Sequence, residues 1–277
     1  MKRLYILLGG LLSAVCSANL HDFRVATWNL QGSSAANESK WNINVRQLLT
    51  GIDAADILMV QEAGTLPASA TRTGRMVQPA GVGIPIEEYL WNLGTGRRPD
   101  LVYIYYSRID VGANRVNLAI VSRRRADEVF VVTTDSTVLL SRPAIGIRIQ
   151  NDVFLSAHAL ASGGSDAGRI VEHVYRFFSE SARNRYNWML VGDFNRSPNS
   201  LENFLRTQEP ATSNNTLILA PTEPTHRSGN ILDYAVLHNA DQGQHQTTDM
   251  SASIMFNQFR SQIASDHFPV SFVRNRK

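Results

Sequence analysis

Short apolar runs alternate with helix-like segments along this chain of 277 residues, and this pattern constrains its fold most. Segment 41–49 carries apolar side chains at helical spacing, and a second helix is predicted after the loop 163–166. Segments 101–106 and 117–122 can pair as antiparallel strands, which argues against a simple doubly wound parallel sheet. The sequence therefore predicts one α/β domain of mixed strand order, with strands at 23–28, 57–60, 101–106, 118–122, 129–132, 145–149, 153–159, 188–191, 231–237 and 270–273.

The first eighteen residues differ from the rest of the chain. Lys2 and Arg3 precede an apolar run over 4–15, and small residues follow it. This layout is typical of a secretory signal peptide, and the run is too short to cross a membrane comfortably. We expect a signal peptide over 1–18, a single domain over 19–277 and a secreted protein. Lipidation of Cys16 is the less favoured alternative.

Loss of the signal peptide changes the charge and thiol content of the chain. The only cysteine is Cys16, so no disulfide or thiol chemistry is expected in the mature protein. The full chain carries 27 basic and 24 acidic residues, and removal of Lys2 and Arg3 leaves 25 against 24, a net charge of +1. Net charge is therefore a weak argument for a polyanionic partner. Nearly all the bases are arginines, which bind phosphate better than lysines do.

Polar residues recur where the predicted strands begin or end. Each one alone favours a turn or a cap. Together they supply carboxylates and amides that suit a hard divalent cation, and two imidazoles that can move protons near neutral pH. The set is Asn29, Gln61, Glu62, His158, Asp193, Asn195, Asp233, Asp266 and His267.

The motifs around these residues resemble the endonuclease/exonuclease/phosphatase family, over almost the whole mature chain. That family includes pancreatic-type deoxyribonucleases, abasic-site endonucleases, inositol polyphosphate 5-phosphatases and neutral sphingomyelinases. The resemblance implies a four-layer α/β sandwich, with two packed mixed β-sheets flanked by helices. It is carried by Thr27-Trp28-Asn29, Gln61-Glu62, Ser156-Ala157-His158, Gly192-Asp193-Phe194-Asn195, Leu232-Asp233-Tyr234 and Ser265-Asp266-His267-Phe268-Pro269-Val270.

Segments 22–32, 39–48 and 124–131 resemble one branch of this family, the B subunits of cytolethal distending toxins. This closer resemblance implies a secreted bacterial genotoxin subunit that hydrolyses phosphodiester bonds of host DNA. It also implies a ternary complex with two lectin-like subunits, A and C, and action in the host nucleus.

The family resemblance implies metal-assisted phosphoester hydrolysis. Glu62 is the first expected metal ligand, with Asn29 and Asp266 nearby, and the expected ion is Mg²⁺, with Mn²⁺ or Ca²⁺ as alternatives. Asp193 and Asn195 are expected to position the attacking water or a phosphate oxygen.

The two histidines of the motifs are expected to carry protons or to contact phosphate. We favour His158 as the general acid and His267 as the base or phosphate ligand, with Asp233 orienting one of them. Family members differ over whether a histidine or the aspartate equivalent to Asp193 is the base, and the sequence leaves this open. His21, His173, His226, His238 and His245 lack a motif and are predicted to be surface or structural residues.

Two arginines are candidate phosphate ligands. Arg142 lies in a segment that resembles the phosphate-contacting segment of the nucleases, and Arg115 precedes a strand. A solvated arginine is an equal alternative for Arg142 and the favoured one for Arg115. The run 123–125 is expected on a solvated face, with a DNA-backbone stripe or a nuclear targeting patch as alternatives.

The chain departs from the pancreatic-type nucleases in three ways. Ala63 follows Glu62 where those enzymes place an arginine that enters the minor groove, and their disulfide is missing. Asp100 is only a weak candidate for the carboxylate partner of His158. A phosphatidylinositol 3,4,5-trisphosphate phosphatase with the same site is therefore the main alternative. The intact residue set argues against a dead binding module, and the lack of an apolar loop argues against a sphingomyelinase.

Overall fold

The computed structural model describes residues 19–32, 40–79, 84–109, 115–134, 141–255 and 265–275. The predicted signal peptide over 1–18 lies outside the described residues and stays a prediction. Within the described ranges, none of the helices combines the length and the apolar character that crossing a membrane requires.

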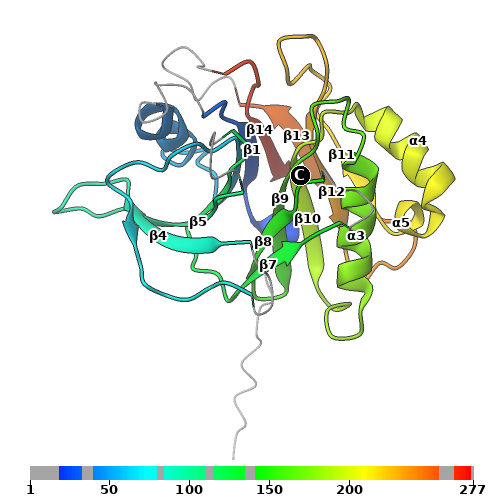
Figure 1. The fold of residues 1–277 in the computed structure, drawn as a ribbon, viewed down its shortest axis with the longest axis horizontal. Coiled ribbons are helices and arrows are strands. Elements are labelled where there is room, and N and C mark those ends of the chain that lie inside the picture. The colour runs from blue at the N-terminus through cyan, green and yellow to red at the C-terminus, as the bar shows by residue number, and fades with distance from the viewer. Residues whose placement is uncertain are drawn as a thin grey trace, which may run out of the picture.

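Two mixed β-sheets form the centre of the molecule (Figure 1). The first sheet has eight strands, in the order β13 (Met250–Ile254), β14 (Val270–Arg274), β1 (Val25–Asn29), β2 (Ile57–Gln61), β6 (Leu118–Ser122), β5 (Leu101–Ser107), β4 (Ile86–Asn92) and β3 (Thr71–Arg72). The second has six, in the order β11 (Leu217–Leu219), β12 (Asp233–His238), β10 (Asn187–Asp193), β9 (Asp152–His158), β8 (Ala144–Ile149) and β7 (Glu128–Val132).

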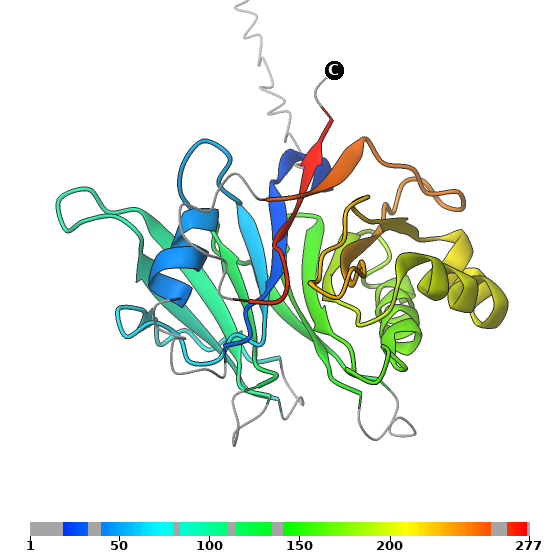
Figure 2. The ribbon, with the colours of Figure 1, turned by 90° about the horizontal axis from the view of Figure 1, so that it is seen from above.

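The sheets pack face to face, and helices cover their outer faces (Figure 2). The residues of one strand alternate between the layers, as strand geometry requires. Val25 of β1 lies in the core between the sheets, whereas Trp28 packs outward. The outer layer of the first sheet is η2 (Lys40–Val45) and α2 (Arg46–Leu48), and that of the second is α3 (Ala167–Ser179), α4 (Pro198–Gln208) and α5 (Pro210–Asn214). The predicted four-layer α/β sandwich is confirmed.

All the predicted strands are present, with ends shifted by one or two residues. β5 and β6 pair antiparallel as expected, with Tyr103 opposite Ser122. The helix after the loop 163–166 is α3, whereas the predicted helix over 41–49 begins as a π-type turn. The prediction missed β3, β4, β11, β13, α4 and α5, and also the short turn η1 (Leu20–Asp22). The apolar runs in the missed strands are short or interrupted by charged and polar residues.

Strand register brings the polar strand ends together. β1 pairs parallel with β2, and β9 with β10, so in each sheet two carboxyl ends lie at one edge. The antiparallel strands β14 and β12 begin at that same edge. Asp193 is consequently opposite His158 on one side and Asp233 on the other. The preceding residue must be glycine, because a Cβ on Gly192 would lie 1.9 Å from the carbonyl oxygen of Ala157.

Candidate active site

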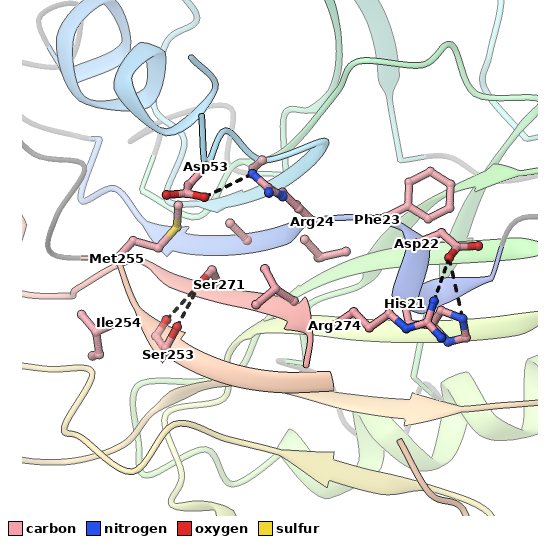
Figure 3. Close-up of a pocket in the computed structure, with 14 residues that line it drawn as sticks. His21, Asp22, Phe23, Arg24, Asp53, Ser253, Ile254, Met255, Ser271 and Arg274 are labelled. Carbon is pink, nitrogen blue, oxygen red and sulfur yellow. Dashed lines mark hydrogen bonds and ion pairs between the residues drawn. The ribbon is translucent and has the colours of Figure 1, made fainter. Parts of the chain in front are cut away.

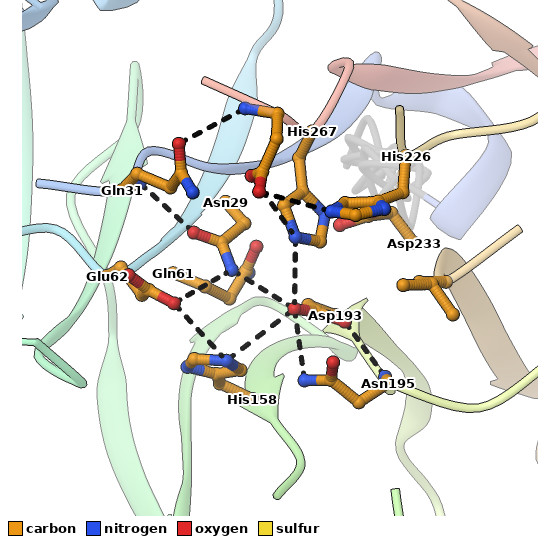
Figure 4. Close-up of polar contacts among 12 residues, drawn as sticks. Asn29, Gln31, Gln61, Glu62, His158, Asp193, Asn195, His226, Asp233 and His267 are labelled. Carbon is orange, nitrogen blue, oxygen red and sulfur yellow. Dashed lines mark hydrogen bonds and ion pairs between the residues drawn. The ribbon is translucent and has the colours of Figure 1, made fainter. Parts of the chain in front are cut away.

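Asp193 is the centre of a buried polar constellation at this edge (Figure 4). Its Oδ2 accepts hydrogen bonds from Asn29 Nδ2 at 3.0 Å and from Asn195 Nδ2 at 3.2 Å. The same oxygen lies 3.5 Å from Nε2 of His158 and 3.6 Å from Nε2 of His267. Burial and the negative charge of Asp233 raise the pKa of Asp193 to about 7, so this carboxylate can exchange a proton near neutral pH.

His267 is paired with Asp233. Its Nδ1 lies 2.9 Å from Oδ2 of Asp233, and Thr225 Oγ1 donates to that same oxygen at 2.7 Å. Burial opposes a charge on His267, but the carboxylate of Asp233 outweighs it and raises the pKa of His267 to about 9. The structure thus joins Asp233 to His267, and His267 is protonated at neutral pH.

His158 has the opposite electrostatic environment. Burial, together with the charges of Arg142 and His267, lowers the pKa of His158 to about 3, so the ring is neutral at pH 7. Its Nε2 lies 3.8 Å from Oε1 of Glu62. Its Nδ1 is buried and has no hydrogen-bond partner among the described residues. The suggestion that Asp100 partners His158 is wrong, because Asp100 pairs with Arg123 at 2.7 Å, at the edge where β5 begins.

Glu62 and Asp266 are the more exposed of the predicted metal ligands, whereas Asn29 is buried. The side chain of Glu62 is 24% exposed, and its Oε1 accepts from Asn29 Nδ2 at 3.3 Å. Burial raises the pKa of Glu62, and the hydrogen bond from Asn29 opposes that shift. Asp266 has one buried oxygen, Oδ1, that accepts no hydrogen bond from the described residues. These carboxylate and amide oxygens fit a hard cation such as Mg²⁺.

Two groups of three ligand atoms are close enough to share one ion in the part of the chain that the structure describes. One is His226, Asp266 and His267, and the other is Asp193, Asp233 and His267. Glu62 belongs to neither group, so its predicted role as the first metal ligand stays a prediction.

The arginines predicted to bind phosphate lie in different environments. Arg142 is half-buried, and its Nη1 donates to the carbonyl oxygens of His158 and Ala159 at 3.4 and 3.3 Å. Arg115 is exposed, ahead of β6. The structure thus brings Arg142 to the constellation, beside His158.

His226 is a residue of this region that the sequence analysis missed. It forms a β-bridge with His267, and the two ring centroids lie 4.6 Å apart. Its Nε2 lies 3.2 Å from Oδ2 of Asp266. The prediction of a surface or structural residue gave no sign of this position beside His267. The only signal in the sequence was its position seven residues before Asp233, in the segment that leads into β12.

A pocket of about 410 Å³ lies elsewhere, along β1, β14 and β13 (Figure 3). Arg24, Asp53 and Arg274 line it, and none of the predicted site residues does. The constellation is therefore separate from this pocket.

Comparison with known proteins agrees with the motifs. The model of the Endonuclease/Exonuclease/phosphatase family matches residues 26–267. A homolog of the cytolethal distending toxin B subunit from Salmonella typhi is 55% identical over 262 residues, which cover 95% of this chain and 93% of that protein. The cytolethal distending toxin B subunit of Escherichia coli is 48% identical, over 99% of this chain and 100% of that protein.

Solved structures give the same result. A chain of the Haemophilus ducreyi cytolethal distending toxin is 67% identical, with a TM-score of 0.89, over 93% of this chain and 100% of that chain. A 3'-5' exonuclease of Neisseria meningitidis is 15% identical with a TM-score of 0.55, over 91% of this chain and 100% of that one, and shows the fold alone. The chain belongs to the endonuclease/exonuclease/phosphatase family and, within it, to the family of cytolethal distending toxin B subunits.

Proposed function

We propose that this chain is the catalytic subunit of a secreted bacterial genotoxin, a metal-dependent endonuclease that hydrolyses phosphodiester bonds of host DNA. One observation carries the proposal. A buried carboxylate, Asp193, is fixed by two amides and lies between two imidazoles of opposite protonation state. Hydrolysis of a phosphoester needs such a set, because a proton must leave the attacking water and negative charge must be stabilised on the phosphoryl oxygens.

Asp193 is the proposed general base. Its pKa of about 7 matches removal of a proton from water near neutral pH. Asn195 donates to Asp193 through its backbone N–H at 2.8 Å as well as through its side chain, and these two bonds hold the carboxylate of Asp193 in place. The side chain of Asn195 also donates to Ala159 O at 3.1 Å, which fixes it beside Asp193, where it is proposed to position the attacking water or a phosphate oxygen.

The two histidines exchange the roles that the sequence favoured. His267 is the protonated ring, and it is the proposed donor to a phosphate oxygen or to the leaving oxygen, oriented by Asp233. His158 is neutral in the free protein and is proposed to contact phosphate through Nε2. Arg142, and more distantly Arg115, are proposed to bind phosphate.

Glu62, Asn29 and Asp266 would hold the metal ion, proposed as Mg²⁺ with Mn²⁺ or Ca²⁺ as alternatives. The ion would supply stabilisation of the negative charge that develops on the phosphoryl oxygens.

The names of the similar proteins support the remaining proposals. They are B subunits of a toxin with several subunits, and we propose lectin-like A and C subunits as partners of this chain. A signal peptide over 1–18, secretion and action on DNA in the host nucleus complete the proposal.

A plasmid-nicking assay tests the nuclease. Supercoiled plasmid should be nicked with Mg²⁺ and left intact with a chelator. His158→Ala should lower the rate about 100-fold or more, as expected for a group that contacts the reacting phosphate. A folded His158→Ala protein that nicks at a near-normal rate would remove His158 from catalysis.

Hydrolysis of phosphatidylinositol 3,4,5-trisphosphate at the same site is the second candidate. It is favoured by the segment after Glu62, where Ala63 is fully buried and its N–H donates to Asn117 O at 2.8 Å. This segment therefore presents no arginine to a DNA groove. Release of phosphate from the lipid headgroup by a protein that leaves plasmid intact would favour this candidate over the nuclease.

A further inference from the structure

His226 is held against the active site by backbone hydrogen bonds. The N–H of Arg227 donates to Asp266 O at 2.9 Å, and the N–H of Phe268 donates to Thr225 O at 2.7 Å. These bonds flank the β-bridge between His226 and His267. Side chains on such a paired segment keep their separation, which favours a preformed binding site.

Three ligand atoms of this segment converge without a complete set of partners. Nε2 of His226 lies 3.2 Å from Oδ2 of Asp266, and Nε2 of His267 lies 3.9 Å from Oδ1 of Asp266. Among the described residues, nothing donates a hydrogen bond to that buried Oδ1. The ligand atoms of the three residues all lie within 4.8 Å of one another, so a single cation can contact all of them.

The imidazoles of His226 and His267 each have a partner on Nδ1, the ring nitrogen that faces away from the three converging ligand atoms. Nδ1 of His267 lies 2.9 Å from Oδ2 of Asp233. Nδ1 of His226 lies 2.7 Å from Oγ of Ser228 and accepts from the backbone N–H of Ser228 at 3.0 Å. Metal-binding histidines commonly donate their second N–H to a carboxylate or another oxygen, which directs the Nε2 lone pair at the ion. Ser228 Oγ also accepts from Asn230 Nδ2 at 2.9 Å, which fixes that oxygen.

We propose that His226, Asp266 and His267 form a second cation site, which prefers a nitrogen-binding divalent ion such as Zn²⁺ to Mg²⁺. Two imidazoles and one carboxylate suit zinc, whereas Mg²⁺ takes oxygen ligands. On binding, the ring proton of His226 moves from Nε2 to Nδ1, where Ser228 Oγ accepts it and replaces the contact from the Ser228 backbone N–H. The Nε2 proton of His267 is released to solvent.

An ion at this site would inhibit the enzyme. This consequence of the site rests on the proposed function. It would occupy Nε2 of His267, the atom proposed to contact the reacting phosphate. It would also occupy Asp266, a proposed Mg²⁺ ligand. Low concentrations of Zn²⁺ should therefore stop hydrolysis even with Mg²⁺ in excess.

Zn²⁺ alone, titrated into the metal-free full chain against a chromogenic zinc chelator, tests the site. Wild-type protein should bind one Zn²⁺, and His226→Gln should weaken binding at least about ten-fold. His245→Asn is the matched control, because His245 is exposed and its N–H donates to Asn214 O outside the constellation. The control should bind Zn²⁺ like wild type. Equal affinity in wild type and His226→Gln would overturn the site.

Two further measurements separate the site from its consequence. In imidazole NMR spectra of wild-type protein, Zn²⁺ should first shift the signals of His226 and His267, and a first shift of any other histidine would overturn the site without any variant. In the nicking assay with Mg²⁺, the Zn²⁺ concentration that halves the rate should rise in His226→Gln by the same factor as the dissociation constant. If the Zn²⁺ concentration that halves the rate is the same in His226→Gln as in wild type, inhibition through this site is overturned. A wild-type protein that binds Zn²⁺ through His226 but never nicks plasmid would instead refute the proposed nuclease.

Discussion

Ionisable groups are buried around Glu88 and around Asp193, and these two of the molecule's buried charged regions differ in how completely their polar atoms are paired. Glu88 of β4 is fully buried, and its carboxylate accepts from Arg75, Arg125, Thr73 Oγ1 and Tyr105 OH at 2.6–3.3 Å. Around Asp193, by contrast, His158 Nδ1, Asp233 Oδ1 and Asp266 Oδ1 are buried without a hydrogen-bond partner among the described residues.

This difference separates a structural charge cluster from a catalytic one. At Glu88, burial raises the pKa of the carboxyl group. The hydrogen bonds that it accepts from cations and hydroxyls outweigh burial, and its pKa is lowered. Buried atoms without partners cost free energy, and three of those in the described residues gather around Asp193, where a ligand or substrate can complete the pairing. Neighbouring groups whose pKa values are shifted in opposite directions, as at His158 and His267, are also typical of catalytic sites.

The largest expected effect is on activity at Asp193. Asp193→Asn should lower the nicking rate about 1,000-fold, because the amide cannot take a proton from water. The folded-state pKa of Asp193 is raised above its unfolded value, so its charge costs stability as pH rises from about 4 to about 7. The variant should therefore melt no lower than wild type at pH 8. A nicking rate within ten-fold of wild type would remove Asp193 as the base.

At Glu88 the large effect should be on stability. Glu88→Ala leaves Arg75 and Arg125 without their shared carboxylate and should cost about 3–5 kcal/mol of unfolding free energy, measured by denaturant titration. Glu128→Ala is the control, because the Glu128 side chain is 47% exposed and its ion pair with Arg148 should contribute less than about 1 kcal/mol. Equal losses in the two variants would mean that the Glu88 cluster stabilises no more than a surface pair.

The pairing of His267 with Asp233 should be visible in a pH titration. His267 has a folded-state pKa of about 9, above its unfolded value of 6.5. Its contribution to stability is therefore complete below pH 6.5 and is lost as pH rises through 9. Asp233→Asn should lower the pKa of His267 by at least about one unit, followed by imidazole NMR in the metal-free protein. An unchanged titration would show that Asp233 does not set the charge of His267.

The smallest effect is expected at Arg124, in the basic run 123–125. Its two neighbours pair with Asp100 and Glu88, whereas its own guanidinium lies over the ring of Phe23 at 5.8 Å. Arg124→Ala should change the nicking rate less than about two-fold at each of several salt concentrations. A clear loss of rate at low salt that shrinks as the salt concentration rises would restore the DNA-backbone stripe as the role of this run.

The sequence predicted those parts of the fold that carry a strong local signal. Apolar runs predicted β1, β2, β9 and β10, and their polar ends predicted the residues that the structure brings together at one edge. The polar ends predict this convergence because parallel neighbours finish at the same edge of a sheet.

The rest depends on contacts between segments far apart in the chain. His226 reaches the site through pairing with a segment about forty residues later, which no local pattern encodes. Glu88 lies in β4, a strand that the sequence did not predict, and only packing shows that its carboxylate is buried and paired with Arg75 and Arg125. The protonation states of His158 and His267 likewise follow from burial and neighbours, and not from the motifs that contain them.

The most direct test of the contrast between the two regions applies one chemical change in both. Glu62→Gln and Glu88→Gln each replace a carboxylate with an amide of similar size, and the nicking rate per folded molecule is measured with Mg²⁺ for both. We predict a loss of about 100-fold or more for Glu62→Gln, a proposed metal ligand, and a change of less than about three-fold for Glu88→Gln. A near-normal rate in Glu62→Gln, or a comparable loss in folded Glu88→Gln, would contradict the separation of a catalytic cluster from a structural one.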